Sequence, residues 1–303
     1  MICIFNPEHD LCLANGNPHY MPPASALRFA RQSAALMQIL YPEAEACIPA
    51  AEVGSISSGL WSQVVPWGWN SVLKGQLLAC GVPAIWLPSD DDLCRWRNLQ
   101  HRSTWLALQP DSRAVTSASE VVSLLDVHPQ LVLKAPWSGS GRGIRWVTDG
   151  MNKLDVSWLE KVVRQQGCAI AEPRRQVAEE FALEYMVWAD RLEFRGFSLF
   201  TSANGVYQGN LLLPDEAIRS RVHFAPSEQQ ELEIWLQTHL IGHYHGPLGV
   251  DYLHTTDCQN HLSELNLRHT MGMVAHAYLA QHPESQGTLF VPTENYYFHL
   301  VNE

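Results

Sequence analysis

The clearest chemical pattern of the chain lies in residues 249–268, GVDYLHTTDCQNHLSELNLR, which predict a β-hairpin. An apolar, β-rich run comes first, TDCQ supplies turn residues, and polar and apolar side chains alternate after it. With the turn centred between positions 257 and 258, Asp251 and Glu264 face each other with Cβ atoms roughly 4.5–5.5 Å apart. Alternation then places Asn266 and Arg268 on the same face as Glu264. The hairpin therefore predicts two carboxylates and an amide side by side.

Two carboxylates at this separation repel each other unless a cation lies between them. Carboxylate and amide oxygens suit a hard divalent ion, Mg²⁺ or Mn²⁺. A solvated acidic hairpin face is the alternative. The metal interpretation is favoured because Leu262 shares the face, and because apolar residues predict a well-buried pair of strands: Val250, Leu253, Leu265 and Leu267. We therefore predict Asp251, Glu264 and Asn266 as metal ligands.

A second pattern, an apolar strand followed by a glycine- and serine-rich turn, could bind phosphate groups. QLVLKAP contains a strand lysine, and a further strand, IRWV, follows the turn. Glycines let backbone N–H groups approach phosphate oxygens, serines add donors and the lysine adds a positive charge. The alternative is an ordinary glycine hairpin with a snorkelling lysine; the turn is neither a Walker A loop nor a dinucleotide fingerprint. The predicted nucleotide contacts in this segment are Lys134, Ser138, Gly139, Ser140, Gly141 and Gly143.

Carboxylates on two later segments could contact the rest of a nucleotide. AIAEP, residues 169–173, is an apolar strand end that could present backbone groups and Glu172 to an adenine edge. Taken alone, Glu172 is explained more simply as part of a surface strand end. Glu180 and Glu184, in EEFALE, could reach a ribose or merely decorate a strand.

The composition is that of an ordinary globular protein: 303 residues, 46% hydrophobic and 17% charged, enough for two or three subdomains. A formal net charge of −11 argues against nucleic acid as a main partner, because nucleic-acid binders need a basic footprint. Seven scattered cysteines without a CxxC pair fit reduced thiols. No run approaches the roughly eighteen apolar residues of a membrane span, and the N-terminus lacks signal-peptide features. We expect a cytoplasmic protein with no membrane partner.

Strands and helices alternate through residues 1–95, which predicts a small α/β unit with a parallel sheet. Antiparallel strands are expected after the glycine-rich turn, followed by a helix, the hairpin and a closing helix. The local expectations for this chain include a polar loop over 6–23, a helix over 24–40, a strand over 83–88, a helix over 98–108 and a helix over 119–125 capped by Ser119.

Four features occur in one order: a strand lysine before a glycine-serine turn, a strand end with one glutamate, a Gly-x-Asp strand, and Glu-x-Asn-x-Arg on the returning strand. Together they resemble the ATP-grasp superfamily, whose members bind Mg-ATP between two α+β subdomains. The spacings from Asp251 to Glu264 and from Glu264 to Asn266 are similar to those of carboxylate–amine ligases such as the D-alanine ligases. The resemblance implies an ATP-grasp fold, α/β plus α+β, with an N-terminal Rossmann-like pre-ATP-grasp domain.

The resemblance also implies a division of the chain. Residues 1–95 would form the pre-ATP-grasp α/β domain, 96–170 the small lid subdomain with the glycine-rich turn, and 171–303 the C-terminal subdomain with the metal-binding hairpin. Many members carry a further ATP-contacting lysine in an Asn-x-x-x-Lys pattern, where this chain has Asn98 and Arg102. Arg102 is a candidate phosphate contact, although arginine and lysine are not equivalent there.

The implied activity is that of an ATP- and Mg-dependent ligase joining a carboxylate to an amine. The carboxylate would attack the γ-phosphoryl group of ATP to give an acylphosphate, and the amine would then displace phosphate. Arg268 would steady the acylphosphate. Arg195 is a second catalytic candidate at the γ-phosphate, or else an exposed strand arginine. A kinase acting on a small hydroxyl substrate and a non-catalytic nucleotide-binding regulator are the alternatives.

The sequence does not identify the carboxylate or the amine. The loop after the first strand could line the acceptor pocket, because α/β sheets bind ligands at the carboxyl ends of strands. Its polar candidates are Asn6, Glu8, His9 and Asp10. A homodimer is expected only because symmetric dimers are common among enzymes.

Overall fold

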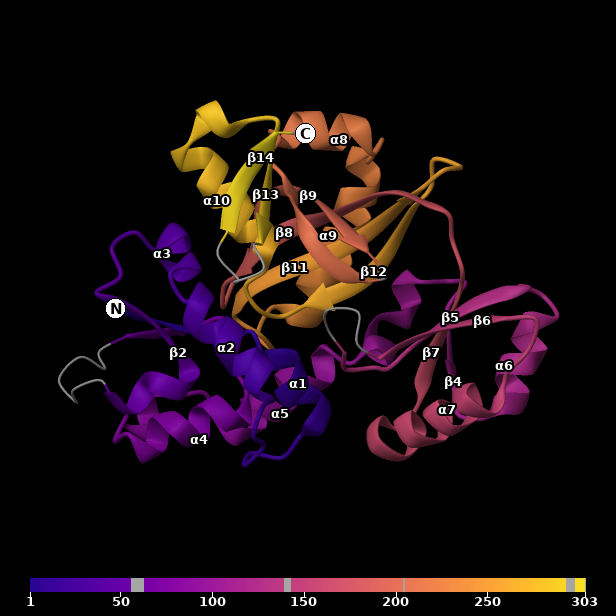
Figure 1. Cartoon of the computed structure of the whole chain (residues 1–303), viewed down its shortest axis with the longest axis horizontal. Coiled ribbons are helices and arrows are strands. Elements are labelled where there is room, and N and C mark those ends of the chain that lie inside the picture. The colour runs from indigo at the N-terminus through magenta and orange to yellow at the C-terminus, as the bar shows by residue number, and fades with distance from the viewer. Residues whose placement is uncertain (56–62, 139–142, 204, 293–297, 303) are drawn as a thin grey trace.

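The computed structural model describes residues 1–55, 63–138, 143–203, 205–292 and 298–302. The described chain forms three sheets, each belonging to a different part of the molecule (Figure 1). The large sheet occupies the upper part of this view, while the N-terminal part and the small sheet lie below it on opposite sides. Within the described residues, no helix combines the length and the apolar character that crossing a membrane requires.

The N-terminal sheet contains three parallel strands in the order β2-β1-β3, which confirms the predicted parallel α/β unit. The central strand is fully buried, because alternate side chains of ICIF face helices on opposite sides. Whether this unit is Rossmann-like stays a prediction. Its elements are β1 (Ile2–Phe5), α1 (His9–Asn15), α2 (Ala24–Ser33), α3 (Leu36–Leu40), β2 (Ala46–Pro49), β3 (Val64–Pro66), α4 (Ser71–Ala79) and α5 (Asp90–Leu99).

Two local expectations for this part are wrong. The single helix over 24–40 is divided into α2 and α3, because the amides of Met37 and Gln38 bond three residues back and tighten the turn. The strand over 83–88 is a 3₁₀ turn, Ala84–Trp86, whose Ile85 is 90% exposed. These residues are mostly exposed and do not pack as a strand within a sheet.

Capping residues explain three further differences. The loop over 6–23 contains α1, which ends at Gly16 in the left-handed conformation. The helix over 98–108 is instead the end of α5, begun by a capping box at Ser89, followed by a 3₁₀ segment, Arg102–Leu108. The helix α6 begins after Ser117, whose side chain accepts from the amide of Glu120, so Ser119 is not the cap.

The small sheet has four antiparallel strands in the order β4-β7-β5-β6. Its helices bury one apolar face of the sheet. A domain boundary at residue 170 would divide β7, so we propose the boundary after Pro173. The elements are β4 (Arg113–Val115), α6 (Ala118–Leu125), β5 (Gln130–Lys134), β6 (Ile144–Thr148), α7 (Lys153–Gln166) and β7 (Ala169–Pro173).

The large sheet contains seven strands in the order β12-β11-β8-β9-β10-β13-β14, all antiparallel to their neighbours. Two of them, β13 and β14, were not predicted. Its apolar face packs on α8 and α9, whereas α10 contacts β9 and also α3 of the N-terminal part. The elements are β8 (Val177–Val187), β9 (Leu192–Ala203), β10 (Val206–Leu211), α8 (Asp215–Arg221), α9 (Pro226–Leu240), β11 (Gly246–Thr255), β12 (Asn260–Asn266), α10 (Met271–Gln281), β13 (Thr288–Pro292) and β14 (Phe298–Asn302).

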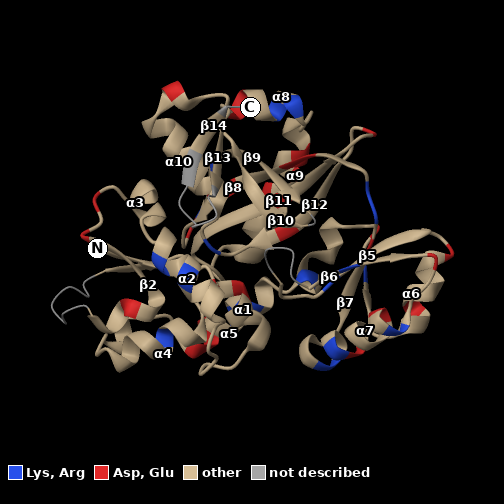
Figure 2. Ribbon diagram, viewed as in Figure 1, with Lys and Arg blue, Asp and Glu red and all other residues tan. Residues whose placement is uncertain are grey.

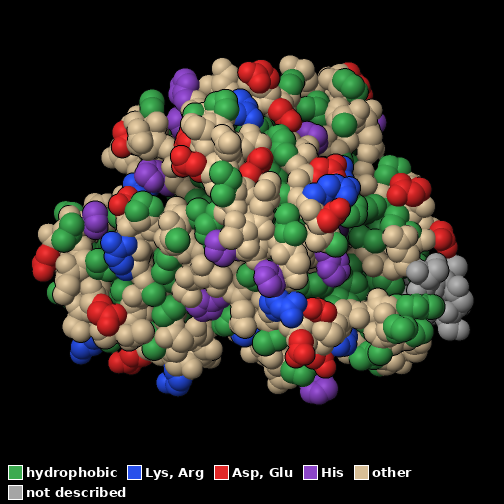
Figure 3. Space-filling view, turned by 180° about the vertical axis from the view of Figure 1, so that it is seen from behind, with side chains coloured by type: hydrophobic (Ala, Val, Ile, Leu, Met, Phe, Trp, Pro, Cys, Tyr) green, Lys and Arg blue, Asp and Glu red, His purple; other side chains and the backbone are tan. Residues whose placement is uncertain are grey.

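Charged residues of both signs are distributed over all three parts (Figure 2). On the face seen from behind, basic side chains lie beside acidic ones (Figure 3). This distribution agrees with the expectation that nucleic acid is not a main partner, which stays a prediction.

Candidate active site

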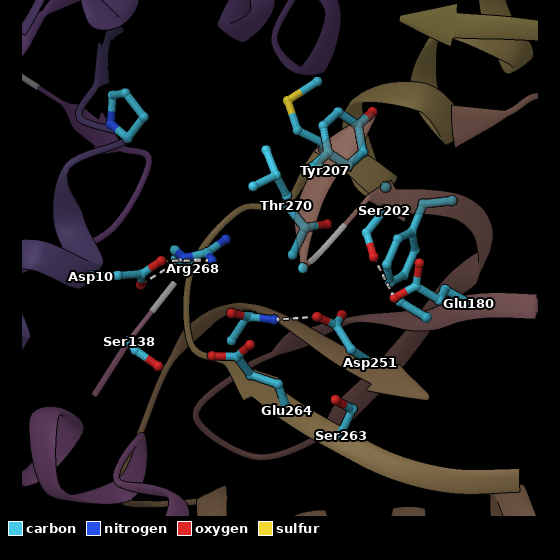
Figure 4. Close-up of a pocket in the computed structure, with 18 of the residues that line it drawn as sticks. Asp10, Ser138, Glu180, Ser202, Tyr207, Asp251, Ser263, Glu264, Arg268 and Thr270 are labelled. Carbon is cyan, nitrogen blue, oxygen red and sulfur yellow. Dashed lines mark hydrogen bonds and ion pairs between the residues drawn. The ribbon is translucent and has the colours of Figure 1, made fainter. Parts of the chain in front are cut away.

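A cavity of about 660 Å³ lies where the large sheet, the small sheet and the N-terminal part meet. One side is formed by polar residues of β8, β11 and β12, and Figure 4 shows Glu180, Asp251 and Glu264 pointing into the same space. We call Glu180, Glu184, Asp251 and Glu264 the acidic face. Alternation along β8 turns Glu180 and Glu184 towards the cavity, because Phe181, Leu183 and Tyr185 pack in the core on the other side of the sheet.

The hairpin of β11 and β12 brings the predicted metal ligands together. Asp251 pairs with Glu264 across the strands, and Gly249 pairs with Asn266. The amide of Asn266 donates to Asp251, with 3.0 Å between Nδ2 and Oδ2. The structure therefore places both carboxylates and the amide at one point of the cavity wall, with the register expected from the sequence.

A β-bulge changes the pattern nearer the turn. Tyr252 pairs with Leu262, so Ser263 is an extra residue on β12. The expectation that Leu262 shares the face of Glu264 is therefore wrong: Leu262 is 6% exposed and packs in the core. The bulge leaves Ser263 lining the cavity, where its hydroxyl lies 3.2 Å from the Nζ of Lys134.

The donor set fits a hard divalent cation that completes its coordination with phosphate oxygens. The Oδ1 atom of Asn266 is buried without a partner in the described structure. Burial and then repulsion by Glu264 hold the pKa of Asp251 well above its usual range. A cation between these groups would give Oδ1 of Asn266 a partner and would offset the repulsion between Asp251 and Glu264. No three His, Cys, Asp or Glu side chains gather as a metal site in the described part of the chain, so phosphate oxygens would have to complete the ligand set.

Lys134 and Glu172 lie together on the small sheet. They form an ion pair of 2.8 Å, and both are at least nine-tenths buried. The strands β5 and β7 are adjacent, and their register sets Glu172 opposite Val132 and Ile170 opposite Lys134, so Lys134 and Glu172 are diagonal neighbours on one face. The other carboxylate oxygen, Oε1 of Glu172, has no partner within the described residues. Both residues line a second cavity, of about 790 Å³, which shares Lys134 and Glu180 with the first, whereas Glu172 lines only the second.

Arg102 connects Ser138, where the glycine-rich turn begins, to Glu264 of the hairpin. It is 4% exposed, donates to the carbonyl of Ala135 and the hydroxyl of Ser138, and forms an ion pair of 2.6 Å with Glu264. Gly143 has a φ of +82°, and a Cβ there would lie 2.9 Å from the Cβ of Ser138. The remaining predicted contacts lie outside the described residues: Gly139, Ser140 and Gly141.

Arg268 joins the hairpin to the N-terminal part. Its Nε and Nη2 atoms donate to the two carboxylate oxygens of Asp10 at 3.0 and 2.9 Å, a bidentate pair visible in Figure 4. Burial alone would raise the pKa of Asp10, but the charge and hydrogen bonds of Arg268, together with the charges of His9 and Arg102, outweigh it and lower that pKa. The pair fixes both the arginine and α1 at the edge of the cavity.

The remaining predicted residues differ in position. Glu180 lines both cavities and accepts a hydrogen bond of 2.9 Å from Ser202. Arg195 is exposed, pairs with Glu193 at 3.4 Å and is not part of either cavity wall. Of the described candidates, Arg195 and Gly143 line neither cavity. Of the four polar residues named in the loop after β1, only Glu8 and Asp10 line the first cavity, whereas Asn6 and His9 do not.

Several cavity residues were not predicted as site residues. Glu184 was considered only for a ribose or as decoration, and Ser198, Ser202 and Thr270 were not considered at all. Alternation along β9 places Ser198 and Ser202 beside the two glutamates of β8, but only the pairing of those strands reveals it.

Comparison with known proteins gives a match at the level of structure alone. No protein-family model and no curated protein sequence matches the chain. Among solved structures, biotin carboxylase from Campylobacter jejuni, as a β,γ-ATP complex, matches with a TM-score of 0.56 and 13% identity over 92% of this chain and 67% of that one. D-alanyl-alanine synthetase A from Vibrio cholerae matches with a TM-score of 0.54 and 13% identity over 93% of both chains. N5-carboxyaminoimidazole synthetase from Staphylococcus aureus, complexed with ADP, matches with a TM-score of 0.52 and 14% identity over 92% and 76%.

The chain has the ATP-grasp fold. The predicted fold class is thereby confirmed. The sequence resemblance implies a nucleotide site in the space between the small and the large sheet, and this stays an expectation. Both cavities adjoin that space, because each is lined by Lys134 of the small sheet and Glu180 of the large sheet.

Proposed function

We propose that the protein is an ATP-dependent ligase that joins a carboxylate to an amine and requires Mg²⁺ or Mn²⁺. The observation that carries the proposal is the paired carboxylates Asp251 and Glu264, with the unpartnered oxygen of Asn266, in a cavity adjoining the space between the two ATP-grasp sheets. Two of the similar structures are complexes with ADP and with β,γ-ATP, which supports a nucleotide as one substrate.

The nucleotide would extend from the second cavity into the first. Glu172 and the following chain would receive the adenine, and Glu180 would accept hydrogen bonds from the ribose. The ammonium group of Lys134, which pairs with Glu172 in the structure, would reorient towards a phosphate oxygen. Arg102 and Ser138 would add donors at the end of the glycine-rich turn.

Asp251, Glu264 and Asn266 would hold the divalent ion. When bound, this ion neutralises phosphate charge during phosphoryl transfer. The protein's own groups then position the reactants. Arg268 lies next to the hairpin and, with Asp10 fixing its plane, would stabilise the negative charge of the acyl group as it reacts.

The reaction is a phosphoryl transfer followed by an acyl transfer. An oxygen of the substrate carboxylate forms a bond to the γ-phosphorus while the bond to the β-phosphate oxygen breaks, which gives ADP and an acylphosphate. The amine nitrogen then bonds to the acyl carbon, phosphate leaves with the electrons of the C–O bond, and the nitrogen loses a proton. Both steps use the same positioned groups, which explains why one cavity can serve them.

The test is ADP release from the full chain with Mg²⁺, over pooled carboxylic acids, with and without pooled amines. ADP release that requires a carboxylate supports the ligase. ADP release with a hydroxyl acceptor and a stable phosphoester would instead identify a kinase, and nucleotide binding without turnover would identify a regulator.

A further inference from the structure

Glu184 lies at the opposite end of the acidic face from Glu180. The two residues are four positions apart on β8, roughly 13 Å along the strand, and share one face. Asp251 lies between them in the sheet, because it pairs with Ala182 on β8. If Glu180 contacts the ribose and Asp251 the phosphates, Glu184 lies beyond the γ-phosphate. It therefore belongs to the part of the cavity where the acceptor substrates would bind.

The carboxylate of Glu184 occupies a specific cradle. Its oxygens accept from Ser198 Oγ at 3.0 Å and from Thr270 Oγ1 at 2.8 Å, and the residue is 1% exposed. Two glycines make room for it. A Cβ at Gly272 would lie 2.0 Å from Oε1, and one at Gly249 would lie 3.1 Å from Oε2.

The charge of Glu184 has no direct counter-ion. In the described structure neither a lysine nor an arginine forms an ion pair with it. The cations that act on it are engaged elsewhere, since Arg268 binds Asp10 and His276 lies 3.4 Å from Asp215. Burial raises the pKa of Glu184 to about 7 against the effect of its two hydrogen bonds. Each carboxylate oxygen retains a further acceptor site, which a cationic donor could use.

Part of the cavity wall is apolar, although Glu8 and Asp10 line the same cavity. Phe5, Trp67 and Met271 line the same cavity as Glu184, together with Phe29 of α2. The ring of Phe5 contacts those of Phe29 and Trp67 edge to face, with centroids 5.7 and 5.0 Å apart. A substrate group beside these rings gains by burying apolar surface, and a nearby ammonium group gains from the aromatic faces.

We propose that Glu184 binds the ammonium group of the amine substrate, and that this amine carries an apolar substituent that packs against Phe5, Phe29 and Trp67. The proposal rests on the ligase function, and it assigns the acceptor end of the cavity to the amine. Glu180 and Glu184 then have separate tasks on one strand, with a serine of β9 supporting each of them.

The test compares Glu184→Gln with Glu180→Gln. Glutamine keeps the shape of glutamate and can still bond to Ser198 and Thr270, so the cradle of Glu184 can persist. Two reactions are measured with ATP, Mg²⁺ and pooled N-acetyl amino acids and short carboxylic acids. Hydroxylamine traps the acylphosphate as a hydroxamate without needing an amine site, whereas ligation uses 2-phenylethylamine or ethylamine.

We expect Glu184→Gln to raise the KM for 2-phenylethylamine roughly tenfold or more, the loss of one charge-assisted hydrogen bond, while hydroxamate formation falls by a clearly smaller factor because the charge of Glu184 also acts on Asp251. Glu180→Gln should instead raise the KM for ATP and leave the KM for the amine unchanged. Wild-type protein should prefer 2-phenylethylamine to ethylamine.

Other outcomes would overturn the proposal in distinguishable ways. An unchanged amine KM in a Glu184→Gln variant that still forms hydroxamate would reject the role of Glu184 and leave the ligase function intact. Loss of hydroxamate together with ligation would assign Glu184 to the cradle or to acylphosphate formation. Equal use of both amines would reject the apolar substituent. Absence of hydroxamate from the wild type would reject the ligase function, and this proposal with it.

Discussion

The charged side chains on the two sheets that enclose the cavity differ in whether they form ion pairs. On the small-sheet side, Lys134 is paired with Glu172, and Arg102 reaches across to Glu264. On the large sheet, Glu184 is buried and Asp251 is partly exposed in the cavity wall; neither forms an ion pair among the described residues, and the loss of surrounding water raises the pKa of both. Buried carboxylates without counter-ions are costly to a fold. The comparison indicates that the large sheet is built to receive cations, whereas the small sheet supplies cations of its own.

The largest expected effect comes from removing one carboxylate of the hairpin. Asp251→Asn should lower turnover by about 10²-fold or more, because the divalent ion loses a ligand at the reacting phosphates. The thermal midpoint should stay the same or rise, since the neutral amide ends the repulsion by Glu264 without breaking an ion pair. The measurements are ADP release and a thermal melt of the same sample.

Glu264→Gln is the matched control, because it leaves the guanidinium of Arg102 buried without its partner. This variant should lose turnover to a similar extent but should also melt at a lower temperature. If Asp251→Asn produced ADP at a near-normal rate, the metal assignment would be rejected. Equal losses of stability in the two variants would contradict the proposed difference in ion pairing, because of these two carboxylates only Glu264 has an arginine partner among the described residues.

The next largest effect concerns the space made for Glu184. Gly272→Ala places a methyl group against the Glu184 carboxylate, so we expect a loss of roughly 1–3 kcal/mol in the free energy of unfolding. Gly75 lies in the interior of α4 with nothing within 4 Å of a Cβ placed on it. Gly75→Ala should therefore stabilise the protein by roughly 0.5–1 kcal/mol through helix propensity. Urea denaturation measures both, and equal shifts would show that Glu184 does not need the cradle.

A smaller effect is expected where the hairpin meets the N-terminal part. Arg268→Lys keeps the positive charge but cannot form the two parallel hydrogen bonds to Asp10, so kcat should fall by about tenfold with little change in KM for ATP. Asp10→Asn tests whether the arginine acts directly, because it loosens the guanidinium without removing its charge. A larger loss of kcat in Asp10→Asn than in Arg268→Lys would mean that anchoring α1 matters more than the arginine itself.

The sequence was most informative where the chemistry and the period of the strand agree. Asp251, Glu264 and Asn266 lie together as expected, but the register next to the turn differs by one residue, with Tyr252 opposite Leu262, and the bulge at Ser263 brings Asp251 opposite Glu264. The bulge at Ser263 could not be foreseen, because nothing in the local residue types distinguishes it from regular alternation.

Contacts between distant segments were not accessible from the sequence. The role of Glu184 depends on Ser198, Gly249, Thr270 and Gly272, which come from three other segments. Arg195 shows the converse, since its strand was predicted correctly but its side chain lies outside the cavities. Chemistry-bearing residues can be recognised by type, but only strand order decides which of them meet.

The smallest predicted effect tests how the loop after the hairpin is held on the N-terminal part. Burial lowers the pKa of His269 to about 4, and the ring lies between the hydroxyl of Tyr41, at 2.8 Å, and the carbonyls of Pro66 and Trp67. An unfolded histidine titrates near a pKa of about 6.5, so between about pH 6.5 and 4 the unfolded chain binds the extra proton and stability falls as pH falls. From about pH 7 to 5.5 this group should cost about 1 kcal/mol. His269→Asn should remove that part of the acid sensitivity, which urea denaturation at the two pH values measures against the wild type. An identical loss in both proteins would show that His269 is protonated in the folded state, and that its neutral ring does not join the two parts.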